Sequence, residues 1–388
     1  MSTRAEFDCI VIGAGVQGSF TAYQLAKSGK TTLLLEQFVL PHTRGSSHGQ
    51  TRIIRKAYEQ NFYCHMMEEC YQLWAQLEKE TGVELYRQTG HLVMGPEDSQ
   101  SYQMIKSTLQ RNKAPMVLLT KENFSQYAPH VNLSEGDAAL LDVDGGLLYA
   151  DRTLKTVQGQ FVKLGGVIRD NEPVTDIKPG PVVTVSTPSG VYRAKGVVIT
   201  AGPWANRVLA HTGLQLPLKV VKLNVCYWKE KVPGTYHLKN PFPCFSLTEC
   251  QETKVLIYGF PSNEYPGLMK ICFHAGKDTD PDQRDLQMDR SDIDILKTYI
   301  ARCFPGLVPE PVVVESCMYT MTPDAHFVLD YHPDHGNIVI GAGFSGHGFK
   351  FGPIIGKILR DLILGEIPSH DLSHFKIRRF QEKTTSAL

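Results

Sequence analysis

The residues best suited to chemistry stand in a few short stretches, and the most unusual stretch contains a cysteine. In VESCMYTMTPDAHFVLD, Cys317 is followed shortly by a turn of Thr, Pro and Asp. If VESCMYT forms a strand, Cys317, Tyr319 and Met321 lie on one face, because side chains alternate along a strand. Most free cysteines are small buried apolar residues. This stretch alone therefore leaves both a structural and a chemical role open for Cys317.

The glycine motif GAGVQG near the start of the chain is typical of dinucleotide binding. Gly13 allows a tight turn, Gly15 lets the backbone approach a pyrophosphate, and Gly18 lets helix and strand pack closely. The helix N-terminus favours the phosphates through its free N–H groups and its dipole. Glu36 ends the next predicted strand, where a carboxylate binds ribose hydroxyls and repels a 2′-phosphate. We expect FAD or NAD rather than NADP, against the alternative of a chance glycine turn.

Two arginines follow a glycine-rich loop in HTRGSSHGQTRIIRKAY. Arg52 and Arg55 are three residues apart, so they would share one face if this segment were helical. Ser47 and His48 lie in the preceding Gly-Ser-Ser-His-Gly loop, and such loops approach ligands closely. The alternative is a basic face turned to solvent. We expect a local basic pocket that binds a small anion.

A lysine stands on a predicted strand in the stretch GLMKICFHAG. Period-two alternation places Lys270, Cys272 and His274 on one side of this strand. The other side is apolar and consists of Met269, Ile271 and Phe273. A sheet with one apolar face and one Lys/His face suits a ligand cavity, although a strand with one face in water has the same pattern.

A second glycine-rich loop, GAGFSGHGFKFGP, spans residues 341–353 just before a predicted helix. Glycines such as Gly346 and Gly348 allow backbone N–H groups to converge on an acceptor, and Lys350 could add a positive charge. The alternative is a flexible linker, which the apolar strand and helix on either side disfavour.

The elements that must position these residues show two kinds of sequence pattern. Residues near both ends predict strand, glycine loop and helix, with a βαβ unit at the start and an amphipathic helix over 61–80. Strand-like pieces mixed with turns and helices occupy the middle. We therefore predict an α/β nucleotide-binding domain and a second, α+β domain, each built from separated segments. The first would comprise residues 1–85, 146–215 and 321–388, and the second residues 86–145 and 216–320.

Composition excludes several classes of protein. Forty basic residues balance forty acidic ones in the 388-residue chain, which argues against a nucleic-acid-binding surface. Nine cysteines without a CxxC pair fit neither a disulfide framework nor a zinc ribbon, and suggest a reducing compartment. No apolar run is long enough to cross a membrane, and a strand near Cys9 leaves no room for a signal peptide. Histidines are scattered, so no metal site is expected.

Together these segments resemble the sarcosine oxidase family of FAD amine oxidases, from about residue 7 to residue 380. The most specific parts are GSSHGQTRIIRKAY, CMYTMTPDAHFVLD and GAGFSGHGFKF. The resemblance implies a glutathione-reductase-like FAD-binding Rossmann domain beside a mixed-sheet substrate domain that covers the flavin. It also implies that Cys317 bonds covalently to the flavin and so holds FAD in place.

The resemblance further assigns roles to individual residues. Arg55 and Lys350 match a pair that binds the substrate carboxylate, and Lys270 matches the lysine where oxygen is activated. Arg52 and His48 match residues beside the flavin ring. Residues expected to line the substrate cavity are Tyr258, His274 and Tyr319. Residues expected to bind FAD are Gly13, Gly15, Gly18, Glu36, Ser47, His48, Cys317, Gly346, Gly348 and Lys350.

Three hypotheses of function follow. The first is an FAD oxidase of secondary amino acids such as sarcosine, L-pipecolate and L-proline, with O2 reduced to hydrogen peroxide. The second is a flavin dehydrogenase that passes electrons to a protein or quinone, which Lys270 disfavours. The third is a non-catalytic dinucleotide-binding protein, which the set of Arg55, Lys270, Cys317 and Lys350 disfavours.

The final tripeptide is Ser386-Ala387-Leu388. Peroxisomal members of the family end in a Ser-Lys-Leu-like tripeptide, and this chain matches its small first residue and final leucine but lacks the basic middle residue. We expect a peroxisomal protein recognised by the import receptor, or otherwise a cytoplasmic one, and from the resemblance we expect a monomer.

Overall fold

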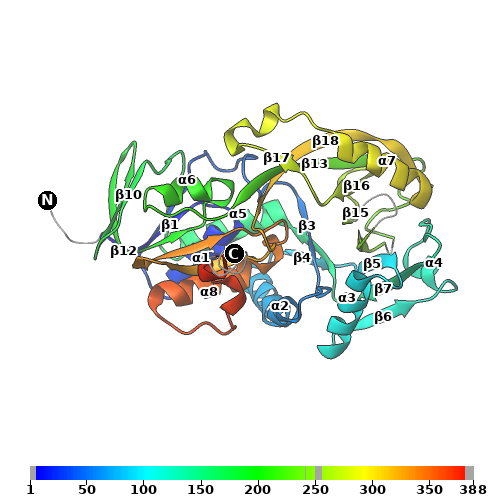
Figure 1. Cartoon of the computed structure of the whole chain (residues 1–388), viewed down its shortest axis with the longest axis horizontal. Helices are drawn as coiled ribbons and strands as arrows, with labels where there is room; N and C mark the ends of the chain where they lie inside the picture. Colours follow the sequence, from blue (N-terminus) through cyan, green and yellow to red (C-terminus); the bar gives the residue numbers. More distant parts are fainter. Residues whose placement is uncertain (1–5, 241, 250–255, 381–388) are drawn as a thin grey trace, which may run out of the picture. The chain divides into compact units, whose positions relative to one another are not determined.

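A computed structural model describes residues 6–240, 242–249 and 256–380 of the chain (Figure 1). The described chain divides into two compact units, each assembled from separated segments. Unit 1 contains residues 6–49, 150–220 and 318–380, and unit 2 contains residues 50–149 and 221–317 apart from the positions outside the described ranges.

The centre of unit 1 is a sheet whose core strands are parallel. Its parallel strands stand in the order β9 (Val167–Arg169), β2 (Thr32–Leu35), β1 (Phe7–Ile12), β12 (Gly190–Ile199) and β20 (His335–Ala342). Antiparallel strands β10 (Asp176–Lys178), β11 (Val183–Thr187) and β19 (Val328–His332) complete the eight strands found in the described chain. Strand β2 and the C-terminal halves of β1, β12 and β20 are buried and rich in Val, Ile and Leu, as is typical of a parallel sheet covered on both faces.

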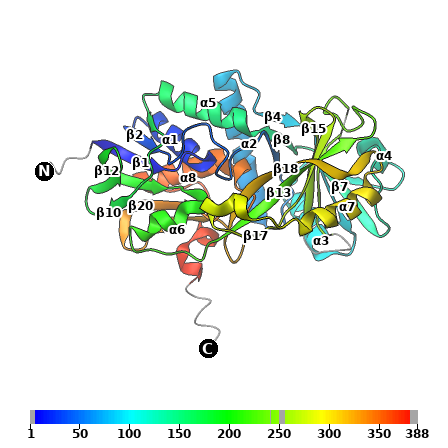
Figure 2. The same ribbon diagram turned by 90° about the horizontal axis from the view of Figure 1, so that it is seen from above.

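Helix α1 (Val16–Lys27) is the central helix of unit 1 and packs between two partners. One is α8 (Gly352–Leu364), and the other is α5 (Ala150–Lys163), which lies beside α1 in Figure 2. The contact with α8 is close because Gly356 has no side chain. A Cβ atom at Gly356 would lie 2.7 Å from the Cβ atom of Phe20. Shorter helices in this unit are η1 (Gly202–Trp204), α6 (Ala205–Ala210), η3 (Phe349–Phe351), η4 (Ser373–Phe375) and η5 (Ile377–Phe380).

Unit 2 is built on a mixed sheet of nine strands in the described chain. Strand β18 (Leu307–Met321) pairs with β13 (Lys219–Glu230). From β13 the sheet continues in the order β16 (Leu268–Phe273), β15 (Ile257–Tyr265) and β14 (Cys244–Leu247). The remaining strands are β17 (Lys277–Asp278), β5 (His91–Pro96), β7 (Asp137–Asp142) and β6 (Met116–Leu119). Strands β14 and β5 are parallel, whereas the pairs β13–β16, β13–β17, β14–β15, β15–β16, β5–β7 and β6–β7 are antiparallel, so the sheet is mixed.

The two faces of this sheet differ in chemistry. Met269, Ile271 and Phe273 join a large apolar core with Trp228 and with helix α7 (Ser291–Cys303). Cys272, in the alternate position, belongs instead to a separate small cluster on the other face. The alternation predicted for the Lys270 strand is therefore confirmed.

Unit 2 also contains a small sheet and further helices. Strands β3 (Thr51–Ile54), β8 (Gly146–Tyr149) and β4 (Tyr86–Gln88) form a small sheet in the order β3-β8-β4. The helices are α2 (Asn61–Thr81), α3 (Gln100–Arg111), α4 (Phe124–Tyr127) and η2 (Pro281–Leu286). No helix within the described ranges combines the length and apolar character needed to cross a membrane.

The predicted elements correspond closely to those in the structure, with one clear exception. The helix predicted over 61–80 is α2, and the predicted strands around Lys270 and Cys317 are β16 and β18. The idea that Arg52 and Arg55 share a helical face is wrong, because Thr51–Ile54 is a strand paired with β8. The sequence-based boundaries placed residues 50–85 in the first domain, whereas these residues pack in unit 2.

Gly18 offers a test of the packing between β1 and α1. A Cβ atom at Gly18 would lie 1.8 Å from the carbonyl oxygen of Gly13 and 2.6 Å from Thr200 Oγ1. Gly18→Ala should therefore lower the free energy of unfolding by about 1–3 kcal/mol or more, measured by urea unfolding. The control is Gly159→Ala, in helix α5 with open space around it, which should raise stability by about 0.5–1 kcal/mol. Equal effects of the two substitutions would contradict the packing argument.

Candidate active site

The glycine motif of unit 1 forms a tight turn between β1 and α1. Gly13 has a φ angle of +100°, a conformation that favours glycine, and its peptide N–H is bonded to the carbonyl of Leu35. Gly15 is the N-cap of α1 and makes no side-chain capping bond. The first helical N–H, that of Val16, donates instead to Ser47 Oγ at 3.0 Å. Ser47, predicted as a cofactor residue, therefore lies at the helix N-terminus.

Glu36 holds the end of β2 against this turn. Its Oε2 accepts the N–H of Ala14 at 2.8 Å, and its Oε1 accepts the N–H of Phe38 at 3.1 Å. His42 Nε2 lies 3.5 Å from Oε1. A carboxylate oxygen has more than one acceptor position, so Glu36 can accept ribose hydroxyls while keeping these backbone bonds.

The second glycine loop of unit 1 lies against the first. Gln17 Nε2 donates a hydrogen bond of 2.9 Å to the carbonyl of Gly348, although the two residues are 331 positions apart in sequence. The loop is also anchored through Ser345, whose Oγ accepts the N–H of Thr322 at 3.2 Å. Gly346 has a positive φ of 80°. The structure therefore brings Gly346 and Gly348 together with the GAGVQG turn.

Lys350 and His48 are the polar side chains predicted to act beside these loops. Lys350 lies in the short helix η3, is 5% exposed, and its Nζ donates to the carbonyl of His347 at 2.9 Å. His48 Nδ1 lies 2.6 Å from the carbonyl of Gly45. A carbonyl can only accept, so Nδ1 carries the proton and this bond fixes the ring orientation.

These features of unit 1 fit the ADP half of FAD. Gly13 and Gly15 contribute no side chain at the start of α1, where Ser47 Oγ accepts the first helical N–H. A pyrophosphate would therefore meet the backbone closely at this helix N-terminus. The buried carboxylate of Glu36 stands at the end of the adjacent strand, where it suits ribose hydroxyls.

In unit 2, one face of the nine-stranded sheet collects most of the remaining predicted residues. Strand pairing sets Tyr258 opposite Cys272 and Tyr227 opposite Lys270. Cys317 on β18 belongs to the same small cluster as Cys272 and Tyr227, with Tyr258 packed against it. The lysine and the cysteine that the sequence singled out separately therefore lie on one surface.

Lys270 is almost completely buried on this face. Its side chain is 7% exposed, and its Nζ lies 3.0 Å from Glu264 Oε1 and 3.4 Å from Thr51 Oγ1. Its ammonium also lies over the ring of Phe260, 5.0 Å from the centroid. Such contacts are favourable for a cation in a desolvated environment.

Glu264 is equally buried and accepts hydrogen bonds from several donors. Its Oε1 contacts Thr51 and Lys270, and its Oε2 accepts the Tyr227 hydroxyl at 2.5 Å. Burial alone would raise the pKa of Glu264, but the charge of Lys270 and these hydrogen bonds hold that pKa below its ordinary value. Burial and the adjacent Glu264 carboxylate raise the pKa of Tyr227, so the phenol remains a donor.

Cys317 differs from the other cysteines around it. Its side chain is 8% exposed, against 1% for Cys272 and none for Cys226. Burial raises the pKa of the Cys272 thiol to about 11 and raises that of Cys226 further. Both of these thiols are therefore poor nucleophiles at neutral pH.

Aromatic rings flank the same face of the sheet. The Tyr258 ring lies 5.7 Å from the His274 ring and 5.9 Å from the Phe260 ring, both in edge-to-face geometry. Tyr319 is two residues beyond Cys317 on β18, so the two side chains leave the strand on the same side.

Arg55 lies in a clamped turn just after β3. Its Nη1 donates to the carbonyl of Ala57, and its guanidinium lies 4.4 Å from the centroid of the Tyr58 ring. Asp142 Oδ2 accepts the N–H groups of Lys56 and Ala57 at 2.6 and 3.0 Å. The carboxylate of Asp142 therefore fixes the backbone that carries Arg55.

Arg52 stands within β3 itself, where its Nη1 donates to the carbonyl of Thr51 at 2.7 Å. The local sequence explains the strand, because the β-branched residues Thr51, Ile53 and Ile54 favour extended structure and pair with β8.

A family model described as FAD dependent oxidoreductase matches residues 8–362 of the chain. This chain belongs to the FAD-dependent oxidoreductase family. The match covers both glycine loops, β16 and β18, which hold the residues described above.

Individual relatives agree with this assignment. The chain is 52% identical to human peroxisomal sarcosine oxidase over 378 residues, covering 96% of both chains. It is 35% identical over 387 residues to monomeric sarcosine oxidase from Bacillus sp. (strain B-0618), covering 98% of this chain and 97% of the relative. Among solved structures, NikD, an unusual amino acid oxidase essential for nikkomycin biosynthesis, superposes with a TM-score of 0.84 at 25% identity, covering 96% and 98% of the two chains.

Several residues of these clusters are not predicted by any sequence motif. Gln17 is one of the variable positions of the glycine motif. Glu264 stands near the end of β15, in a stretch with Pro, Ser and Asn whose sequence is typical of a loop. Thr51, Tyr227 and Asp142 carry no motif. The described residues contain no cluster of three or more metal-ligating side chains.

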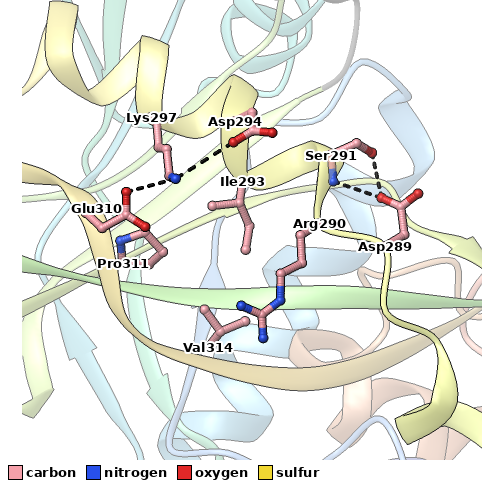
Figure 3. A pocket seen from close by; sticks show the side chains of 9 residues that line it. All are labelled: Asp289, Arg290, Ser291, Ile293, Asp294, Lys297, Glu310, Pro311 and Val314. Atoms are coloured by element: carbon pink, nitrogen blue, oxygen red, sulfur yellow. Dashed lines mark hydrogen bonds and ion pairs between the residues drawn. The ribbon is translucent and has the colours of Figure 1, made fainter.

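A groove of roughly 520 Å³ on unit 2 contains none of the predicted residues (Figure 3). It is lined by charged side chains of α7 and β18 that largely pair with one another. Lys297 lies 2.8 Å from Glu310 and 3.8 Å from Asp294, while Asp289 accepts bonds from Ser291. Within this groove, Lys297 is therefore neutralised by two neighbouring carboxylates.

Asp142 predicts an unusual dependence of stability on pH. Burial raises the pKa of Asp142 to about 6, partly offset by the N–H groups of Lys56 and Ala57. The folded carboxyl holds its proton more tightly than the unfolded one, so the stability it contributes falls as pH rises from about 4 to about 6, by up to about 3 kcal/mol. Asp142→Asn cannot ionise and should lack this loss.

The measurement is the urea unfolding free energy of both proteins at several values between pH 4 and pH 7. The difference between wild type and Asp142→Asn isolates this group from carboxylates such as Asp324, whose ion pair with Arg379 lowers its pKa to about 2. A difference that does not change with pH would refute the prediction.

Proposed function

We propose that the chain is an FAD-dependent oxidase of secondary amino acids, with sarcosine, L-pipecolate and L-proline as candidate substrates. The observation that carries the proposal is the shared face of the unit 2 sheet, where buried Lys270 and Cys317 lie together. The similarity to human peroxisomal sarcosine oxidase and to the Bacillus enzyme supports it.

FAD, when bound, would accept a hydride from the carbon beside the substrate nitrogen and transfer the electrons to O2, giving hydrogen peroxide. The protein would bind its ADP half through Gly13, Gly15, Gly18 and Glu36. Ser47, His48, Gly346 and Gly348 are the further residues proposed to contact it. The imine formed from the substrate is hydrolysed or released.

Substrate binding is assigned to fixed cations. Arg55 and Lys350 would bind the carboxylate, and a guanidinium offers it two parallel hydrogen bonds. The turn that carries Arg55 is already clamped by Asp142, so little ordering is needed when the substrate binds. Tyr258, His274 and Tyr319 would line the substrate cavity, and Arg52 would lie beside the flavin ring.

Lys270 is proposed to act in the step with oxygen. The first electron transferred to O2 produces negative charge, and a fixed cation in a low-dielectric environment stabilises that charge. Lys270 meets this requirement because it is buried, oriented and paired.

Cys317 is proposed to bond covalently to FAD through its sulfur. Its thiol is more accessible than those of Cys226 and Cys272 on the neighbouring strands, which supports its selection for this reaction.

Location and assembly are also proposals. The names of the human and mouse relatives support a peroxisomal location. The tripeptide Ser386–Leu388, and its recognition by the import receptor, lie outside the described residues and remain a prediction, as does the monomeric state.

Oxygen consumption tests the proposed function directly. Purified holoenzyme supplied with sarcosine, L-pipecolate or L-proline should consume O2 and form hydrogen peroxide in equal amounts, measured with an oxygen electrode and a peroxidase assay. A dehydrogenase would instead reduce an artificial acceptor or a quinone with little oxygen uptake. Protein that binds no flavin at all would revive the non-catalytic hypothesis.

Acid precipitation tests the covalent attachment. The flavin of wild-type protein should remain in the washed pellet and map to a peptide that contains Cys317, while Cys317→Ser should lose it to the supernatant. Cys272→Ser, which changes a thiol on the same face, is the matched control and should keep flavin in the pellet. Flavin retained by the pellet of Cys317→Ser would refute the assignment.

A further inference from the structure

The buried ion pair between Lys270 and Glu264 is more elaborate than a single salt bridge. Both side chains are almost fully buried, at 7% and 5% exposure, with Nζ and Oε1 3.0 Å apart. Thr51 from β3 and Tyr227 from β13 bring two further hydrogen-bond donors to the same carboxylate. Three separate strands therefore supply a donor to Glu264, which itself comes from a fourth.

This arrangement favours the ionised form of Glu264. A carboxylate that accepts hydrogen bonds from a cation and two hydroxyl groups loses those interactions when it is protonated. Its second oxygen is bound by the Tyr227 phenol, which has one proton to donate. These contacts hold the pKa of Glu264 below its ordinary value, so Glu264 presents a negative charge to Lys270 at neutral pH.

The charge matters because Lys270 is buried. A buried lysine without a counter-ion loses its proton readily, since burial in a low-dielectric environment disfavours the charged form. Removing one member of a buried pair is therefore more disruptive than removing an exposed charge.

Other groups near Lys270 do not replace Glu264. Among the described residues, the polar and titratable groups that interact with Lys270 besides Glu264 include Thr51 on β3, Tyr227 on β13, Cys244 on β14 and Cys272 on β16. Tyr265 on β15 and Glu315 on β18 lie beyond Tyr227. Glu315 is the second carboxylate, but it reaches the pair only through Tyr227, at 3.2 Å from the phenol oxygen, and also accepts the Tyr265 hydroxyl at 2.6 Å. Within the part of the chain that the structure describes, Glu264 is thus the carboxylate in direct contact with the lysine.

We propose that Glu264 is a positioning residue that keeps Lys270 protonated and oriented, so that the reaction with oxygen retains its cation up to alkaline pH. The inference rests on the proposed role of Lys270. In this proposal Glu264 would contact neither substrate nor the reacting atoms and would act through Lys270 alone.

A purely structural ion pair is the competing explanation. In that case Glu264 would only anchor the β15–β16 hairpin to β3 and β13. Its loss would lower stability, but it would not introduce a new ionisation into the reaction with oxygen.

The test compares wild type with Glu264→Gln, which keeps the shape of the side chain and removes its charge. Reduced holoenzyme is mixed with O2 in a stopped-flow instrument between pH 6.5 and pH 10, and the flavin absorbance is followed. The wild-type rate should stay nearly constant. In Glu264→Gln, burial without a counter-ion should lower the pH at which Lys270 loses its proton by up to about 3 pH units. Above that pH, the rate of the reaction with O2 should fall about tenfold per pH unit. Reduction of the flavin by substrate should keep its wild-type pH profile.

A second measurement does not depend on turnover. Lysine labelled with ¹³C at the ε carbon reports its own protonation by NMR in the resting protein, and Lys270→Met assigns the signal. This signal should titrate at lower pH in Glu264→Gln than in wild type. Glu264→Asp, whose shorter side chain cannot keep the 3.0 Å contact without movement, should shift it in the same direction and serves if the Gln variant does not fold.

The matched control is Asp144→Asn, which breaks the 2.8 Å ion pair with Lys56 in the same unit. It should keep the wild-type reoxidation profile and Lys270 signal. Coinciding wild-type and Glu264→Gln curves in both measurements would overturn the inference. A Lys270→Met variant that reacts with oxygen at the wild-type rate would instead overturn the role of Lys270 in the proposed function, so the two failures are distinguishable.

Discussion

A strand has only two faces, and the chemistry of unit 2 depends on how β16 uses them. One face sends Met269, Ile271 and Phe273 into the core beneath α7. The other presents Lys270 and Cys272 beside Tyr227 and Tyr258. A shift of one residue in register would bury the lysine in the apolar core and expose the core residues. The large apolar cluster therefore fixes the position of the cation.

Among the described residues, Lys270 and Lys350 are the buried lysines, and they make different contacts. Lys270 contacts a carboxylate, so the local charge is neutral before any ligand binds. Lys350 donates a hydrogen bond to the carbonyl of His347. A balanced overall composition of forty basic and forty acidic residues conceals this difference. Their proposed roles also differ, since Lys350 would bind a substrate carboxylate whereas Lys270 would meet an uncharged O2 molecule.

Much of this arrangement is visible in the sequence because it is local. The GAGVQG turn, the alternation around Lys270 and the strand around Cys317 all depend on residues within a few positions of one another. Glu264 could not be found in this way, because its partners Thr51 and Tyr227 come from distant strands. The helical interpretation of Arg52 and Arg55 failed because pairing with β8 decides the conformation of that segment.

The hydrogen bond between Gln17 and Gly348 joins the first helix of the chain to one of its last loops. The close packing of α1 on α8 joins the same two regions. Synthesis on the ribosome delivers the N-terminal segment long before the C-terminal one. The emerging chain therefore holds the GAGVQG segment without its partner loop until translation is nearly finished. With both loops proposed to bind the dinucleotide, its loading would be a late event in biogenesis, and a chain truncated before residue 348 would lack the second loop.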